Sequence, residues 1–155
     1  MDRFNQWLML FANLGVLVGI VFLAFELQQT TDALAAQSIL ELNLASNSEM
    51  WVIAGDESMA EIEIKAKNGI EELSPVELER YKWAWFASFN TFETAYLFYA
   101  RGIISAEEYN TYYEATCRSL TYPGVVDLLK TGEISFNEGF KRTLATCDES
   151  VKDIL

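Results

Sequence analysis

The sequence predicts an all-α protein in which an N-terminal transmembrane helix extends into a long helix and is followed by a small helical bundle. Three observations indicate this fold. Residues 7–25 contain no charged side chain, Ser-x-x-Glu sequences recur before apolar runs, and no segment alternates as a strand does. The predicted organisation is an N-terminal tail (1–6), a transmembrane helix (7–27), a helical extension (28–55) and a helical domain (56–155).

The transmembrane prediction depends on length. Twenty-two residues without a charge separate Arg3 from Glu26. As a helix they measure about 33 Å, enough to cross a hydrocarbon core of roughly 30 Å. A signal peptide is one alternative, but its apolar region is usually shorter, and the cleavage-like sequence Ala33-Leu34-Ala35 lies too far beyond the run. A buried helix of a soluble protein is the other, and composition alone leaves it open.

The charges that flank this helix predict its orientation. Arg3 precedes the helix, and the next basic residue is Lys65. The chain that directly follows the helix, residues 26–51, carries four acidic side chains, Glu26, Asp32, Glu41 and Glu49. The positive-inside rule therefore favours a cytoplasmic N-terminus and a periplasmic C-terminal domain in a bacterial inner membrane.

Small and polar residues within the predicted span indicate contacts with other helices. Gly15 and Gly19 form a GxxxG motif, and Ala12 extends the small-residue stripe. Asn13 lies about 160° around the helix from Gly15. One interpretation is that both faces meet protein, either other membrane-protein subunits or copies of this chain. The other is that these residues occur there without such a role.

The region after the span contains signals for a series of helices. Residues 26–51 lack Gly and Pro and favour a continuous helix, which Gly55-Asp56 ends. Residues 57–67 form a short amphipathic helix with Met59, Ile62 and Ala66 on one face. A further short helix at 124–130 follows Tyr122-Pro123.

Three capping boxes predict the remaining helices. They begin at Ser74, Ser105 and Ser135, each with Glu three residues later. The helices that they open are predicted at 75–100, 106–120 and 136–147. Gly102 and Gly132 are the expected stops of the helices before them.

The helix at 75–100 is unusually aromatic. Six aromatic residues recur at helical spacing: Tyr81, Trp85, Phe89, Phe92, Tyr96 and Tyr99. Trp83, Phe86 and Phe98 widen this stripe, so we expect other elements to surround the helix. The stripe is interpreted as core, with the wall of a ligand pocket as the alternative. A second span at Trp83–Ala100 is disfavoured because polar residues interrupt the segment.

Glu93 is the one ionisable group of this aromatic stretch. It could be a buried carboxylate that binds a ligand or a proton, or a structural group paired with an arginine such as Arg118. Glu107, Glu108 and Glu114 are interpreted as a solvated face. Di-metal sites in bundles pair Glu with His, and the chain has no His, so no metal or cofactor is predicted.

Composition excludes some classes of function. The chain has 23 acidic and 11 basic residues, and the region after the span has a net charge of about −11. This excess argues against nucleic acid and against an anionic lipid surface as partners. The absence of His removes the commonest general base. Cys117 and Cys147 are expected to form a disulfide if the domain is in an oxidising compartment.

Several segments resemble a known type of protein. NLGVLVGIVFLAFELQQTTDAL, LSPVELERY and FETAYLFYARGIIS, with the later YPGV, are similar to bacterial membrane proteins of uncharacterised function that have one N-terminal span and a small helical C-terminal domain. The resemblance covers most of the chain. It implies a bacterial membrane location and carries no catalytic residues.

These observations favour a membrane-anchored, non-enzymatic interaction protein or accessory subunit of a bacterial membrane complex. The alternative is a ligand-binding or sensing domain with an aromatic pocket around Trp85, Phe89 and Glu93. A third interpretation is an enzyme that uses Glu93 and nearby tyrosines.

Overall fold

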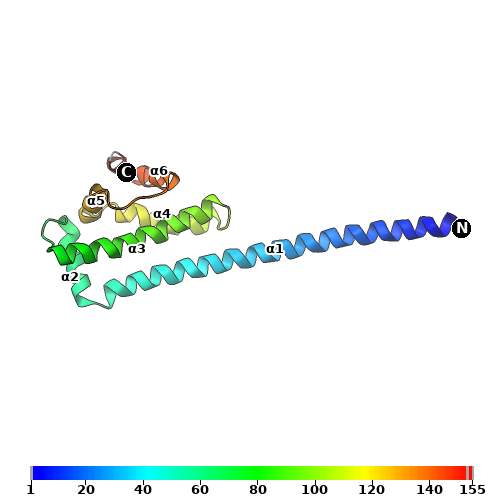
Figure 1. The fold of residues 1–155 in the computed structure, drawn as a ribbon, viewed down its shortest axis with the longest axis horizontal. Coiled ribbons are helices and arrows are strands. Elements are labelled where there is room, and N and C mark those ends of the chain that lie inside the picture. Colours follow the sequence, from blue (N-terminus) through cyan, green and yellow to red (C-terminus); the bar gives the residue numbers. More distant parts are fainter. Residues whose placement is uncertain (1, 153, 155) are drawn as a thin grey trace. The chain divides into compact units, whose positions relative to one another are not determined.

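A computed structural model describes residues 2–152 and residue 154 (Figure 1). In this part of the chain every regular element is a helix, and no strand is present, which confirms the all-α prediction. The chain divides into two compact units, one ending at Gln37 and the other beginning at Ser38. The predicted helical extension at 28–55 is therefore divided between the two units.

The first unit is the N-terminal part of α1, a helix with the bounds Asp2–Ala54. Residues 2–6, expected as a tail, belong to this helix. Its large apolar side chains from Phe4 to Phe25 are 52% to 71% exposed. Among the described residues, α1 is the one helix long and apolar enough to cross a membrane, and α3 is not a second candidate span.

The second unit contains the end of α1 and all later elements. The α-helices are α2 (Glu57–Lys65), α3 (Pro75–Ala100), α4 (Ala106–Ser119), α5 (Pro123–Lys130) and α6 (Glu138–Cys147), and the 3-10 helices are η1 (Ala66–Asn68) and η2 (Glu149–Val151). These bounds match the predicted helices within one or two residues, and η1 takes up the expected end of α2.

Side-chain caps explain where α3 and α4 begin. Ser74 accepts a hydrogen bond from the backbone N–H of Glu77, and the Glu77 carboxylate accepts one from the N–H of Ser74. Ser105 and Glu108 make the same pair of bonds at α4. Both capping boxes are thus confirmed. Gly102 and Gly132 have φ of +70°, a left-handed conformation that favours glycine and follows the ends of α3 and α5.

The third predicted capping box is wrong. Helix α6 begins at Glu138, and its N-cap is Asn137, whose side chain accepts a hydrogen bond from the N–H of Gly139. The physical reason is the side chain of Phe136. It is buried against Phe89 and Phe140, with ring centroids 5.4 and 5.5 Å away, so the chain reaches the core before the helix starts.

The main core surrounds one side of α3. Its buried residues come from α2, η1, α3, α5, α6, η2 and two of the connecting loops, and Phe89 and Tyr81 are the α3 members. A smaller core joins α1 to α3 through Leu42, Ala95 and Ile104. The expectation that other elements surround α3 is wrong on one face, because Trp83 is 63% exposed.

Candidate functional site

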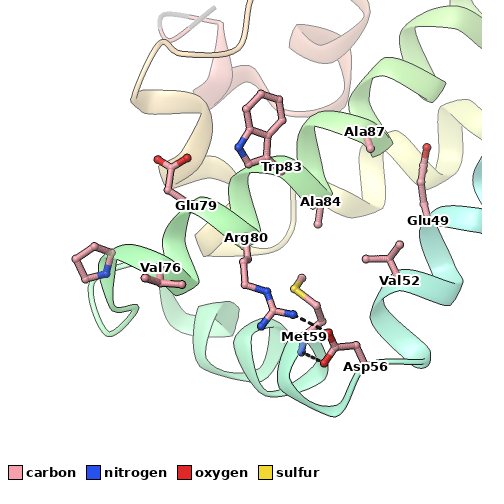
Figure 2. Close-up of a pocket in the computed structure, with 11 residues that line it drawn as sticks. Glu49, Val52, Asp56, Met59, Val76, Glu79, Arg80, Trp83, Ala84 and Ala87 are labelled. Carbon is pink, nitrogen blue, oxygen red and sulfur yellow. Dashed lines mark hydrogen bonds and ion pairs between the residues drawn. The ribbon is translucent and has the colours of Figure 1, made fainter.

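An apolar groove of about 700 Å³ lies among the end of α1, α2 and the first half of α3. Figure 2 places Val52 of α1 across from Ala84 and Ala87 of α3, with Met59 of α2 at one end. Val76 and Trp83 add further apolar surface and are 71% and 63% exposed. The groove is therefore an accessible surface of the second unit.

The path of the chain explains why the groove is open. Within this unit, α1 contacts α3 through the smaller core at Leu42 and through Glu49, whose carboxylate accepts a hydrogen bond from the Thr91 hydroxyl. Beyond Glu49, α1 ends at Ala54, and Gly55 and Asp56 lead the chain into α2. The facing α3 residues are alanines, whose short side chains leave the space between the helices unfilled.

Charged groups line the groove as three acids and one base. The base, Arg80, donates hydrogen bonds to Oδ2 of Asp56 at 2.6 Å and to Oγ of Ser58 at 2.8 Å (Figure 2). The Ser58 hydroxyl, then the backbone N–H groups of Ser58 and Met59, and last the charge of Arg80 lower the pKa of Asp56. Burial raises the pKa of Glu49, against the effect of its hydrogen bond to Thr91. With Glu79 also present, the lining has more negative than positive charge.

A second cavity, of about 220 Å³, contains a carboxylate that the sequence analysis did not single out. It is lined by Ile53, Glu63, Ala66, Lys67, Tyr81 and Tyr122. Burial raises the pKa of Glu63 to about 7, and the nearby indole N–H of Trp85 lowers it only in part. In the described chain, Oε1 of Glu63 and Nε1 of Trp85 are buried side-chain atoms without a hydrogen-bond partner.

A sequence signal for Glu63 was present but did not stand out. Glu63 is four residues after Met59 and three before Ala66, so it lies beside the apolar face of α2. The helix also contains Glu57 and Glu61, and both are exposed. Because α2 contains three glutamates, residue type does not show which one is buried. Only the position of Glu63 beside the apolar face of the helix does.

The Glu93 carboxylate has a structural partner. It accepts a hydrogen bond from the backbone N–H of Asn137, the N-cap residue of α6. The partner is thus a helix terminus and not Arg118, the arginine named from the sequence. Phe89 is fully buried in the main core, and neither Phe89 nor Glu93 lines the two cavities described above.

The remaining sequence-predicted residues lie in different parts of the chain. Cys117 of α4 and Cys147 of α6 form a disulfide with a Cα–Cα distance of 4.9 Å. Ala12, Asn13, Gly15 and Gly19 are exposed on α1, and a Cβ added at either glycine would meet no atom within 4 Å. Because the structure contains one chain, contacts of this stripe with another helix stay a prediction.

Comparisons of the chain with protein-family models, with curated proteins and with solved structures find no match. The resemblance to single-span bacterial membrane proteins therefore remains an expectation. The chemistry of the two cavities is the basis on which a function can be proposed.

Proposed function

We propose that the protein is a non-enzymatic, membrane-anchored interaction protein, an accessory subunit whose groove binds an amphipathic helix of another membrane-protein subunit. The observation that carries this proposal is the open apolar groove between α1 and α3. Helix-in-groove recognition uses such a surface, with apolar side chains of one helix face filling it.

The lining supports a protein partner better than a small molecule. Small-molecule sites hold a few polar groups that converge on the ligand and orient it. Here the guanidinium of Arg80 is engaged by Asp56 and Ser58, and the Glu49 carboxylate is engaged by Thr91. The rest of the surface is apolar and accessible, which favours a partner recognised through a row of apolar side chains.

Charge complementarity indicates the kind of helix. The acidic lining and the acidic excess of the whole chain favour a partner helix with Lys or Arg beside its apolar face. A second copy of α1 is a poor occupant, because it has no basic residue between Arg3 and Lys65. Contacts between copies are better assigned to the small-residue stripe of the span.

The anchor in this proposal is the apolar N-terminal part of α1 in a bacterial inner membrane, with the second unit in the periplasm. Arg3 before the span and acidic residues after it support this orientation. The disulfide between Cys117 and Cys147 supports an oxidising compartment, since such bonds persist in the periplasm and are rare in the cytosol.

Binding of two designed peptides tests the groove. The peptides are helical, share one apolar face, and carry Lys or Glu on the polar face. Fluorescence anisotropy is measured with the full chain in zwitterionic nanodiscs, with empty nanodiscs as the blank. We expect the Lys peptide to bind and the Glu peptide to bind at least about tenfold more weakly, the equivalent of roughly 1.4 kcal/mol.

Two matched variants locate the binding. Val52→Lys places a charge in the groove, and Leu44→Lys places one elsewhere on α1; the two side chains are 54% and 60% exposed, so neither variant removes core packing. We expect Val52→Lys to weaken binding of the Lys peptide by about tenfold or more and Leu44→Lys to leave it unchanged. Equal effects of the two variants would contradict the proposal. So would a groove that binds a neutral acyl chain and does not bind the Lys peptide.

A further inference from the structure

The cavity at Glu63 combines one carboxylate with aromatic rings. Tyr81 and Tyr122 line it, and Trp85 contacts both, with ring centroids 6.2 Å from Tyr81 and 6.5 Å from Tyr122. The Tyr81–Trp85 pair is edge-to-face, and Trp85 itself does not line the cavity. This cluster is separate from the groove, whose lining includes none of these three rings.

Two buried polar atoms at this place lack a protein partner in the described chain. Oε1 of Glu63 is an acceptor and Nε1–H of Trp85 is a donor. Hydrogen bonding by the Trp85 indole N–H lowers the pKa of Glu63 in part, but the contact does not meet full hydrogen-bond geometry and leaves Oε1 of Glu63 without a partner. Buried polar groups in native proteins are nearly always paired, so the Glu63 oxygen in the lining of the cavity indicates a ligand with a positive group.

We propose that this cavity is a binding site for a small organic ammonium ion. The ammonium group would lie against the aromatic rings and pair with the Glu63 carboxylate. The proposal is independent of the proposed function, because it concerns another surface of the unit.

The composition and size of the cavity distinguish this ligand from a metal ion. A divalent cation such as Ca²⁺ takes six to eight oxygen ligands, and the cavity supplies one carboxylate. A volume of about 220 Å³ accommodates a substituted ammonium ion. Lys67 also lines the cavity, but its side chain is exposed and no ion pair joins it to Glu63 in the described chain, so it does not replace the ligand.

The charged neighbours predict how binding depends on pH. Tyr81 faces Glu63 from α3, Lys67 lies on η1, and Asp127 of α5 adds negative charge near Tyr81. Because burial raises the pKa of Glu63 to about 7, a cation that favours the carboxylate form releases a proton when it binds near neutral pH. Its affinity should rise by about tenfold between roughly pH 6 and pH 8.

Calorimetric titration of the full chain in maltoside micelles, which contain no ammonium group, tests the site. Choline is the probe, and 3,3-dimethylbutan-1-ol is its neutral isostere. We expect choline to bind, with the rise in affinity described above, and the isostere to bind at least about tenfold more weakly. Equal binding of the two, or no binding of choline, would overturn the proposal.

Two variants assign the binding to Glu63. Glu63→Gln keeps the shape of the side chain and should weaken choline binding by about tenfold or more and abolish its pH dependence. Glu61→Gln, an exposed position on the same helix, should change neither. Loss of affinity in both variants would overturn the assignment. Glycerophosphocholine distinguishes the source of the ligand: binding as tight as that of choline indicates a lipid headgroup, and weaker binding indicates a free ammonium compound.

Discussion

At the scale of single residues, Glu63 makes stability depend on pH in the opposite direction to a paired carboxylate. Burial raises its pKa to about 7 in the folded protein, against about 4.3 in an unfolded chain. The folded state therefore binds more protons between these values, and the free energy of unfolding falls as the pH rises from about 4.3 to 7. Above about pH 7 the free energy of unfolding does not fall further through this group.

Glu63→Gln should remove the decrease in stability that the Glu63 carboxylate causes as the pH rises. The variant is expected to be more stable than wild type at about pH 8 by on the order of 1–2 kcal/mol, a value reduced because water screens the exposed part of the carboxylate. The two proteins should converge near pH 4. Urea unfolding of both across this range measures the difference, and Glu61→Gln is the control. A difference that does not change with pH would contradict the prediction.

Glu93 stabilises α6 by accepting from the N–H of Asn137. Glu93→Ala removes the acceptor and should cost about 0.5–1.5 kcal/mol, the range for loss of a typical hydrogen bond at an accessible position. Glu93→Gln keeps an acceptor oxygen and should cost less than half as much. Thermal unfolding of the two variants is the measurement. An equal loss in both would show that charge, and not the hydrogen bond, is what matters.

The two glutamates show which parts of a site can be predicted from sequence. Glu93 stood out because its neighbours are aromatic, yet its partner is a backbone amide 44 residues away, and only the folded chain brings the two together. Glu63 lies beside the apolar face of a short helix, but exposed glutamates on the same helix hide the signal. Burial of a carboxylate is thus a property of the packing around it.

At the scale of helices, sequence is a better guide than it is for buried carboxylates, because local chemistry predicts most helix boundaries. Ser74 and Ser105 begin α3 and α4 through contacts within four residues of sequence. Phe136 prevented the same outcome at Ser135, because its long-range contact with Phe89 competed with the local cap. The groove was not predictable for a related reason. Its opening depends on where α1 stops contacting α3.

The disulfide joins α4 to α6 and closes a loop of 30 residues. The chain-entropy relation gives a stabilisation of roughly 3–4 kcal/mol for a loop of this length. We expect a reductant to lower the free energy of unfolding of wild type by about this amount. The variant Cys117→Ser with Cys147→Ser should have the lower stability and should not respond to the reductant. Alkylation of two thiols in denatured protein without reductant would contradict the bond.

At the scale of the whole molecule, the proposed orientation across a membrane would determine which partners the second unit can meet. In the orientation that we propose from the positive-inside rule, this unit lies in the periplasm. An alkaline phosphatase fusion after Leu155 should therefore be active, and a fusion to green fluorescent protein at the same place should be dark. The opposite pattern would reverse the orientation and place Cys117 and Cys147 in a reducing compartment.

We expect the faces of the predicted span to determine whether and how the molecule assembles. Asn13 and the Gly15–Gly19 stripe lie about 160° apart on α1, and all three side-chain positions are exposed in the single chain. Lipid packs well against Leu and Val, so a passive anchor gains nothing from glycine or from an amide. Two contact faces imply two neighbours, as in a ring of copies or a helix inserted into a larger complex, whereas a GxxxG dimer uses one face.

Crosslinking in native membranes distinguishes these arrangements. One variant combines Gly15→Leu with Gly19→Leu, and the other is Asn13→Leu. Interhelical polar contacts in membranes average about 0.6 kcal/mol, so each change should reduce the crosslinked species without abolishing it. We expect both variants to reduce it, because each removes one face. Loss in the glycine variant alone would indicate a dimer. If neither variant changes the crosslinked species, the span is an anchor only, and the partner must bind through the second unit.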